Sequence, residues 1–175
     1  MITIRELDDE SLKAAVKLKI SCWPEELQRM PENAIIFSDE YAFWLDWKHT
    51  GHLHHDLRTL IGAFADEELV GACFASIAEV SDHREAVEIN GLWVDGRYRG
   101  QHIACRLLEK AISAYIGLGK TAVIVYNVHH SPANAFFRRL GGTPIRQDRQ
   151  MDGRLLVDIL QFAIDDLLDR LQIEN

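Results

Sequence analysis

Long hydrophobic runs are missing from this sequence of 175 residues. No apolar stretch reaches the ~18 residues that a membrane-spanning helix requires, and the N-terminus lacks the basic-then-apolar order of a signal peptide. We therefore expect no membrane partner and a cytoplasmic location. Low-complexity tracts and internal repeats are also absent, which argues against a disordered or fibrous protein.

Cysteine is scarce, and its spacing excludes two kinds of site. Three cysteines stand far apart without Cys-x-x-C spacing, at Cys22, Cys73 and Cys105. This pattern indicates reduced thiols and neither a disulfide framework nor a zinc site. Four histidines crowd one stretch, at His49, His52, His54 and His55. No acidic or cysteine partners recur beside them at ligand spacing, so we expect a polar loop and no metal.

Basic residues are outnumbered, with 19 Lys and Arg against 27 Asp and Glu and a net charge of -8. Such a charge repels a phosphate backbone, and no basic stripe offsets it, so nucleic acid is excluded as a partner. An acidic surface is compatible with cationic substrates such as amines, although net charge more often reports solubility.

Hydrophobic periodicity predicts an α/β protein with a single domain over residues 1–175. Strand patterns occur at residues 2–5, 59–65, 69–77, 86–94, 121–126, about 144–150 and 154–163. Five helical patterns accompany these strands. The first follows the capping residues 8–11, the second runs from Ser38 or Asp39 to Gly51, the next two cover residues 101–116 and 131–140, and the last ends the chain. We expect a central mixed, twisted sheet of about six to seven strands flanked by helices. The strand, helix, strand order over 86–126 implies a parallel pair with a right-handed crossover.

Three aromatic residues repeat within the second predicted helix, and we expect Phe43, Trp44 and Trp47 to form its inward face. Pro24 and Pro31 interrupt the stretch before this helix, because proline breaks helical structure.

The segment from Leu92 to Ala104 carries the clearest chemistry. A buried strand empties here into a glycine-containing turn and then a helix. Such a junction directs unpaired backbone N–H groups and the positive end of the helix dipole at one spot, where a pyrophosphate binds well. Glycine spacing alone leaves open a turn in which Gly96 and Gly100 merely join strand and helix.

Residues 99–104, Arg-Gly-Gln-His-Ile-Ala, resemble the coenzyme A loop of the GNAT acetyltransferases. That loop has Arg or Gln, two residues, Gly, one residue, then Gly or Ala. His102 stands where the family usually has the middle glycine, so its side chain must point away from the phosphates or the loop must open slightly. The resemblance implies that the following residues bind coenzyme: Leu92, Trp93, Val94, Arg99, Gly100, Gln101, His102, Ile103, Ala104, Asn134 and Phe137.

A second stretch, residues 131–142, resembles the GNAT helix that lies beside the pantetheine arm. The resemblance covers most of residues 86–170. Phe137 occupies the position where many members carry a tyrosine that protonates the leaving thiolate, and a phenyl ring cannot donate a proton. Tyr126, His130 or water would have to replace it, or the activity is reduced.

The resemblance implies an N-acetyltransferase that uses acetyl-coenzyme A and a primary amine of a small molecule or peptide. The thioester carbonyl would meet a backbone N–H near Trp93 and Val94, which contributes about 3 kcal/mol. Glu88 is the candidate base, because some members place a catalytic glutamate on this strand. Two-residue alternation puts Glu88, Asn90, Leu92 and Val94 on one face. Glu79, Asp82 and Glu85 could form an acidic mouth, whereas the plainer alternative for Glu88 is a solvated or paired carboxylate.

Two other functions stay open. One is a GNAT-like module that binds coenzyme A for a structural or sensing role, which His102 and Phe137 both permit. The other is a nucleotide-binding α/β protein, but the loop lacks the Gly-Lys-Ser/Thr ending of a P-loop. The sequence does not identify the acceptor amine. We expect substrate-facing residues around Trp23, Phe37, Tyr41 and Trp44, and the resemblance allows a homodimer.

Overall fold

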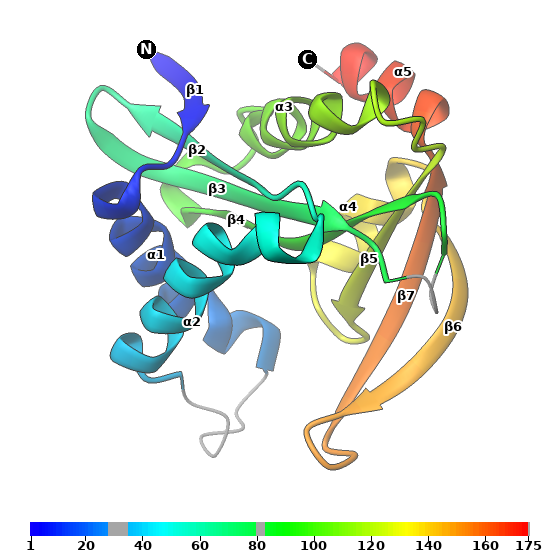
Figure 1. Cartoon of the computed structure of the whole chain (residues 1–175), viewed down its shortest axis with the longest axis horizontal. Helices are drawn as coiled ribbons and strands as arrows, with labels where there is room; N and C mark the ends of the chain where they lie inside the picture. Colours follow the sequence, from blue (N-terminus) through cyan, green and yellow to red (C-terminus); the bar gives the residue numbers. More distant parts are fainter. Residues whose placement is uncertain (28–34, 80–82, 175) are drawn as a thin grey trace.

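Seven strands form one mixed sheet with the order β1-β2-β3-β4-β5-β7-β6 (Figure 1). The computed structural model describes residues 1–27, 35–79 and 83–174. The strands are β1 (Ile2–Glu6), β2 (Thr59–Ala65), β3 (Glu68–Ile77), β4 (Ala86–Val94), β5 (Ala122–Val128), β6 (Thr143–Gln150) and β7 (Leu155–Ala163). β4 and β5 are parallel and the other neighbours are antiparallel. The predicted mixed sheet and its parallel pair are confirmed.

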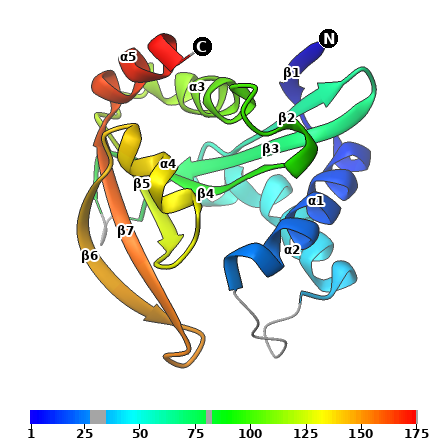
Figure 2. The same ribbon diagram turned by 180° about the vertical axis from the view of Figure 1, so that it is seen from behind.

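Helices cover both faces of this sheet (Figure 2). They are α1 (Asp9–Leu27), α2 (Phe37–Thr50), α3 (Ile103–Ile116), α4 (Ala133–Arg139) and α5 (Ile164–Glu174), with 3₁₀ turns η2 (Gly51–His54) and η3 (Gly96–Tyr98). α1 and α2 lie on one face, which we call the α1 face. α3 and α5 lie on the other, the α3 face, and the buried Phe137 and Leu140 pack α4 into the same core. No helix in the described ranges is long and apolar enough to cross a membrane.

The first two helices differ from the predictions at three points. The cap of α1 is as expected, because the Ser11 N–H donates to Asp8 Oδ1 at 2.7 Å. The helix then runs through Pro24 to Leu27, where we expected a break. α2 begins at Phe37, before the predicted caps Ser38 and Asp39, and its N-cap residue makes no side-chain capping bond.

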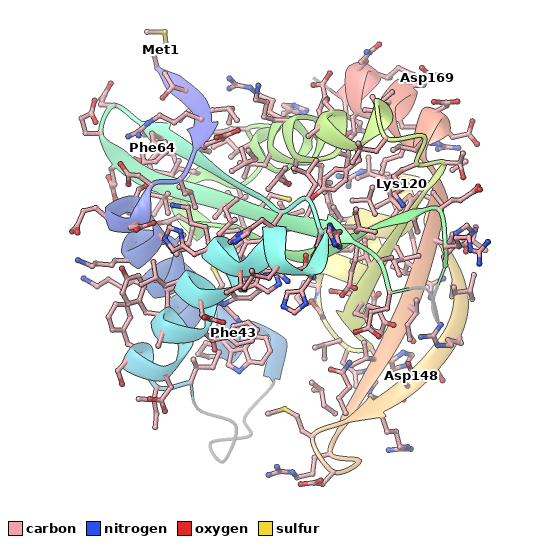
Figure 3. The ribbon with its side chains drawn as sticks, in the orientation of Figure 1. Met1, Phe43, Phe64, Lys120, Asp148 and Asp169 are labelled. Carbon is pink, nitrogen blue, oxygen red and sulfur yellow. The ribbon has the colours of Figure 1, made fainter. Side chains whose placement is uncertain are left out.

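The aromatic side chains of α2 do not all point inward. Trp44 is 6% exposed, but Phe43 is 56% exposed and projects from the helix (Figure 3). The prediction for Phe43 is wrong because neighbouring residues of a helix diverge by about 100°. Phe43 instead contacts Trp44 edge to face, with ring centroids 5.0 Å apart.

β4 contains an extra residue that changes which side chains share a face. The register against β3 shifts between the pairs Ala75↔Ile89 and Phe74↔Gly91, which leaves Asn90 as a β-bulge. The alternation of side chains therefore reverses at that point.

The reversal places Glu88 on the α1 face. Its neighbours Val87 and Ile89 both pack in the α3-face core, as do Leu92 and Val94. Glu88 lies between the first two and so points the other way. The prediction that Glu88 shares a face with Leu92 and Val94 is wrong, because uniform alternation does not account for a bulge.

Candidate active site

A cavity of about 790 Å³ opens where β4 and β5 separate. The parallel register of the two strands ends at the pair Ile89↔Val125, although β4 continues to Val94 and β5 to Val128. The walls include Phe137 from the α3 face and Trp23 from the α1 face. The cavity therefore connects the two faces of the sheet through the gap between the strands.

One end of the cavity is formed by Arg99, Gly100, His102 and the start of α3. The first hydrogen bond around this helix runs from the Arg106 N–H to His102 O at 3.1 Å. The amides of Ile103, Ala104 and Cys105 precede it and have no acceptor within the helix. Together with the helix dipole they form a site suited to an anion such as a pyrophosphate.

His102 adopts a left-handed backbone conformation, with φ 58° and ψ 12°. This conformation costs a residue with a Cβ about 1–2 kcal/mol, and glycine avoids the cost. Gly100, two residues earlier, has φ 76°, and a Cβ there would meet nothing within 4 Å. Glycine therefore suits this position because of the backbone conformation of the turn. The exposed His102 keeps the geometry that a glycine would adopt, and α3 begins directly after it.

Backbone N–H groups on β4 face the gap. Such groups alternate between the two edges of a strand. The Asp95 N–H donates to Val70 O on β3 at 2.9 Å. The Trp93 N–H therefore also faces β3, and the N–H groups of Leu92 and Val94 face the cavity.

Contacts among Arg99, Val94 and Cys22 hold α1 against the end of β4. The Arg99 Nε donates to Val94 O at 3.1 Å, and Cys22 Sγ lies 3.9 Å from the same oxygen. The Arg99 guanidinium also lies 3.9 Å from the Cys22 sulfur. This contact fixes the last turns of α1 beside the cavity.

The family comparison shows to which family the chain belongs. The model of the acetyltransferase (GNAT) family matches residues 12–142, well over half of the chain. The chain belongs to the GNAT family. No curated protein sequence matches it.

Solved structures share the GNAT fold of this chain. PaiA N-acetyltransferase from Thermoplasma acidophilum, in complex with coenzyme A, has 20% identity and a TM-score of 0.73 over 93% of this chain and 99% of its own. Phosphinothricin acetyltransferase from Sinorhizobium meliloti, in complex with acetyl-coenzyme A, has 18% identity and a TM-score of 0.70 over 93% of this chain and 88% of its own. Ribosomal-protein-alanine N-acetyltransferase from Brucella melitensis has 18% identity and a TM-score of 0.68 over 93% of this chain and 99% of its own. At these identities the likeness establishes the fold.

Within this GNAT domain, an apolar surface lines the cavity on the α1 face. Five side chains pack together and also line the cavity: Trp23 from α1, Tyr126 and Val128 from β5, and Leu155 and Val157 from β7. We call this set the apolar floor. Trp23, one of the residues expected to face the substrate, lines the cavity. The cavity wall does not include Phe37, Tyr41 or Trp44, which pack between α1, α2 and the sheet.

Lys19 lies on the cavity wall and was missed from the sequence. Its ammonium is hydrogen-bonded to Glu40 Oε1, and the two side chains are 13% and 18% exposed. Its nitrogen lies 5.5, 5.2 and 5.5 Å from the ring centroids of Trp23, Trp44 and Trp93. The spacing of Lys19 and Trp23 along one helix face was a signal, but Glu40 comes from another helix.

A buried carboxylate organises the loop between β5 and α4. Asp158 accepts from Gln147 Nε2 at 2.7 Å and lies 2.9 Å from His129 Nδ1. Burial is the largest influence and opposes ionisation of Asp158, but these two hydrogen bonds together with the nearby His129 and Arg138 charges outweigh burial and lower the pKa of the carboxyl. Asn134 joins this network, because its Nδ2 donates to Asp158 Oδ2 at 3.4 Å, and it also donates to Val128 O at 3.1 Å.

The structure brings most of the predicted residues to one cavity. Glu88 and Tyr126 line it, with the predicted coenzyme-binding residues Leu92, Trp93, Val94, Arg99, Gly100, His102, Ile103, Ala104 and Phe137. The wall does not include Gln101, Asn134 or His130. The exposed His130 ring packs on His129 with centroids 4.6 Å apart, and Asn134 holds its loop. Within the described ranges, no three His, Cys, Asp or Glu side chains gather as a metal site.

The predicted acidic mouth is placed only in part. Glu79 lines the cavity with an exposed side chain, and Glu85 lies away from the wall. Asp82 lies outside the described residues, as does Pro31.

Proposed function

We propose that this chain transfers the acetyl group of acetyl-coenzyme A to a primary amine of a small molecule or peptide. The observation that carries the proposal is the gap between β4 and β5, which joins an anion site on the α3 side to a carboxylate on the α1 face. One domain thus offers a place for a phosphorylated coenzyme and a separate approach for an amine.

The residues at the α3 end fit coenzyme A. The amides of residues 103–105 would hold the pyrophosphate, with Arg99 and His102 beside it. The N–H groups of Leu92 and Val94 would bond to the pantetheine arm and the thioester carbonyl. Phe137, 4% exposed, supplies an apolar wall. We infer that Val94 is the oxyanion-type donor, because the Trp93 N–H faces β3.

Glu88 supports proton removal from the acceptor. An amine is mostly an ammonium at neutral pH and must lose a proton before its nitrogen forms the amide bond. Glu88 reaches the cavity from the α1 face, on the side opposite the phosphate loop. Glu88 would take this first proton before the attack. As the carbon–nitrogen bond forms and the carbon–sulfur bond breaks, the nitrogen gives up a second proton and the leaving thiolate gains one.

Tyr126 is the better placed of the two predicted proton donors to the leaving thiolate. Phe137 has no proton to give, whereas Tyr126 lines the cavity and Arg146 Nη2 donates to its oxygen at 2.8 Å. This bond would stabilise the phenolate left after proton donation. His130 lies outside the cavity wall.

The test is acetyl transfer to a panel of amines, read as free thiol and as acetylated product. We expect thiol and product in equal amounts, and a loss of turnover in Tyr126→Phe with unchanged binding of acetyl-coenzyme A. The alternative is a coenzyme A-binding module, favoured by Phe137. Binding without transfer, together with turnover restored by Phe137→Tyr, would establish it.

The setting of the reaction is part of the proposal. Cys22, Cys73 and Cys105 form no disulfide bond with one another, which suits a reducing compartment such as the cytoplasm. A homodimer and the absence of nucleic acid partners stay predictions.

A further inference from the structure

We propose that the acceptor is a primary amine carried on an aromatic or branched apolar body, with no carboxylate and no second ammonium group. The inference rests on the proposed acetyl transfer and names the substrate class of the same site. It follows from three features of the α1-face end of the cavity: the apolar floor, the state of Lys19, and the charges around the entrance.

The apolar floor joins α1 to the part of the sheet that contains β5 and β7. Trp23 reaches from α1 and packs with Leu155 and Val157 of β7, on the far side of the gap. Tyr126 and Val128 complete the surface from β5. A polar chain such as a polyamine would lose hydration against this surface without gaining hydrogen bonds, whereas an aromatic or branched apolar group gains from burial.

Lys19 does not supply a carboxylate anchor. Its ammonium is bonded to Glu40, and Trp44 Nε1 donates to the same Glu40 oxygen at 2.7 Å. The rings of Trp23, Trp44 and Trp93 surround the ammonium at 5.2 to 5.5 Å. The positive charge of Lys19 is thus compensated within the protein, and the carboxylate of an amino acid would have to displace Glu40.

The remaining charges around this end favour an ammonium group over a carboxylate. Glu79 and Glu88 line the cavity with negative charge, which attracts a cation and repels a substrate carboxylate. Arg146 sits beside Tyr126 and forms an ion pair with Asp148, at 3.3 Å from its Nε. The charge of Arg146 is thus compensated, and a second ammonium on a long acceptor would meet the apolar floor, where it loses hydration without gaining hydrogen bonds.

The test compares three acceptors of related size: 2-phenylethylamine, phenylalanine and putrescine. We expect kcat/KM for 2-phenylethylamine to exceed that for either competitor by at least about tenfold, the discrimination that an apolar pocket supplies. Better use of phenylalanine or putrescine would overturn the inference and leave the proposed acetyl transfer standing. If acetyl-coenzyme A binds but neither these three acceptors nor any other amine is acetylated, the proposed function fails and the inference fails with it.

A variant pair links the preference to the floor. Trp23→Ala should lower kcat/KM for 2-phenylethylamine by roughly tenfold or more, and reduce that for putrescine much less. The exposed Phe43→Ala removes an aromatic ring away from the cavity and should leave both values unchanged. Equal losses for both acceptors in Trp23→Ala, at unchanged coenzyme affinity, would contradict a role of Trp23 in acceptor choice.

Discussion

Glu88 and Leu92 project to opposite faces of β4, although they lie four positions apart, because Asn90 is an extra residue between them. One strand therefore serves both substrates of the proposed reaction. Before the bulge it presents a carboxylate to the α1 face, where the acceptor would enter. After the bulge it presents the N–H groups of Leu92 and Val94 to the gap, where the coenzyme arm would lie.

Glu88→Gln tests the proposed base. The amide cannot take a proton from the acceptor, so we expect kcat at neutral pH to fall by about 10²- to 10⁴-fold. The affinity for acetyl-coenzyme A, measured by calorimetry, should not change, because Glu88 lies on the opposite face from the phosphate loop. A loss of activity below about threefold would indicate that another group or water removes the proton.

His102→Gly and His102→Val test the left-handed start of α3. Glycine relieves the strain at φ 58° but adds freedom to the unfolded chain, so we expect a gain in unfolding free energy of about 0.5–1 kcal/mol. Valine is β-branched and should lose about 1 kcal/mol or more and weaken coenzyme binding. Urea unfolding measures both. Equal stability of the two variants would contradict the described backbone.

Gly91→Ala tests the packing of Trp93 across the bulged strand. A Cβ on Gly91 would lie 2.0 Å from the Trp93 ring, so the indole must move. We expect a loss of about 1–3 kcal/mol in unfolding free energy. The matched control is Gly96→Ala, because a Cβ there meets nothing within 4 Å. If both variants lose the same stability, the close contact at Gly91 is wrong.

Asp158→Asn tests the carboxylate behind the β5–α4 loop. The folded pKa of Asp158 is lowered, so its contribution to stability is present above the unfolded pKa of about 3.9 and is lost as the pH falls through the folded value. The stability difference between wild type and Asp158→Asn should be largest near neutral pH and narrow below about pH 4. Asp169→Asn, at an exposed position of α5, is the control (Figure 3). A difference that does not vary with pH would contradict the ionised Asp158.

Much of the fold follows from local patterns in the sequence. The strands at 59–65 and 86–94 have the predicted bounds, because apolar and small residues run between clear turn residues. The junction before α3 is also predictable, since residues 92–104 combine a strand end, glycine and a helix start.

Other features depend on contacts between distant segments. The bulge at Asn90 arises from the register against β3, which a single strand does not reveal. Lys19 and Glu40 are 21 residues apart and meet only when α1 docks on α2. The interpretation of Pro24 as a break failed because one proline near the end of α1 does not stop the helix.

The measurement that tests the central claim most directly is acetyl transfer from acetyl-coenzyme A to 2-phenylethylamine, with free thiol and the acetylated amine quantified together. The account predicts equal amounts of the two products with the wild-type chain and a strongly reduced rate with Glu88→Gln. It is contradicted if acetyl-coenzyme A binds but neither this amine nor any other yields thiol and product.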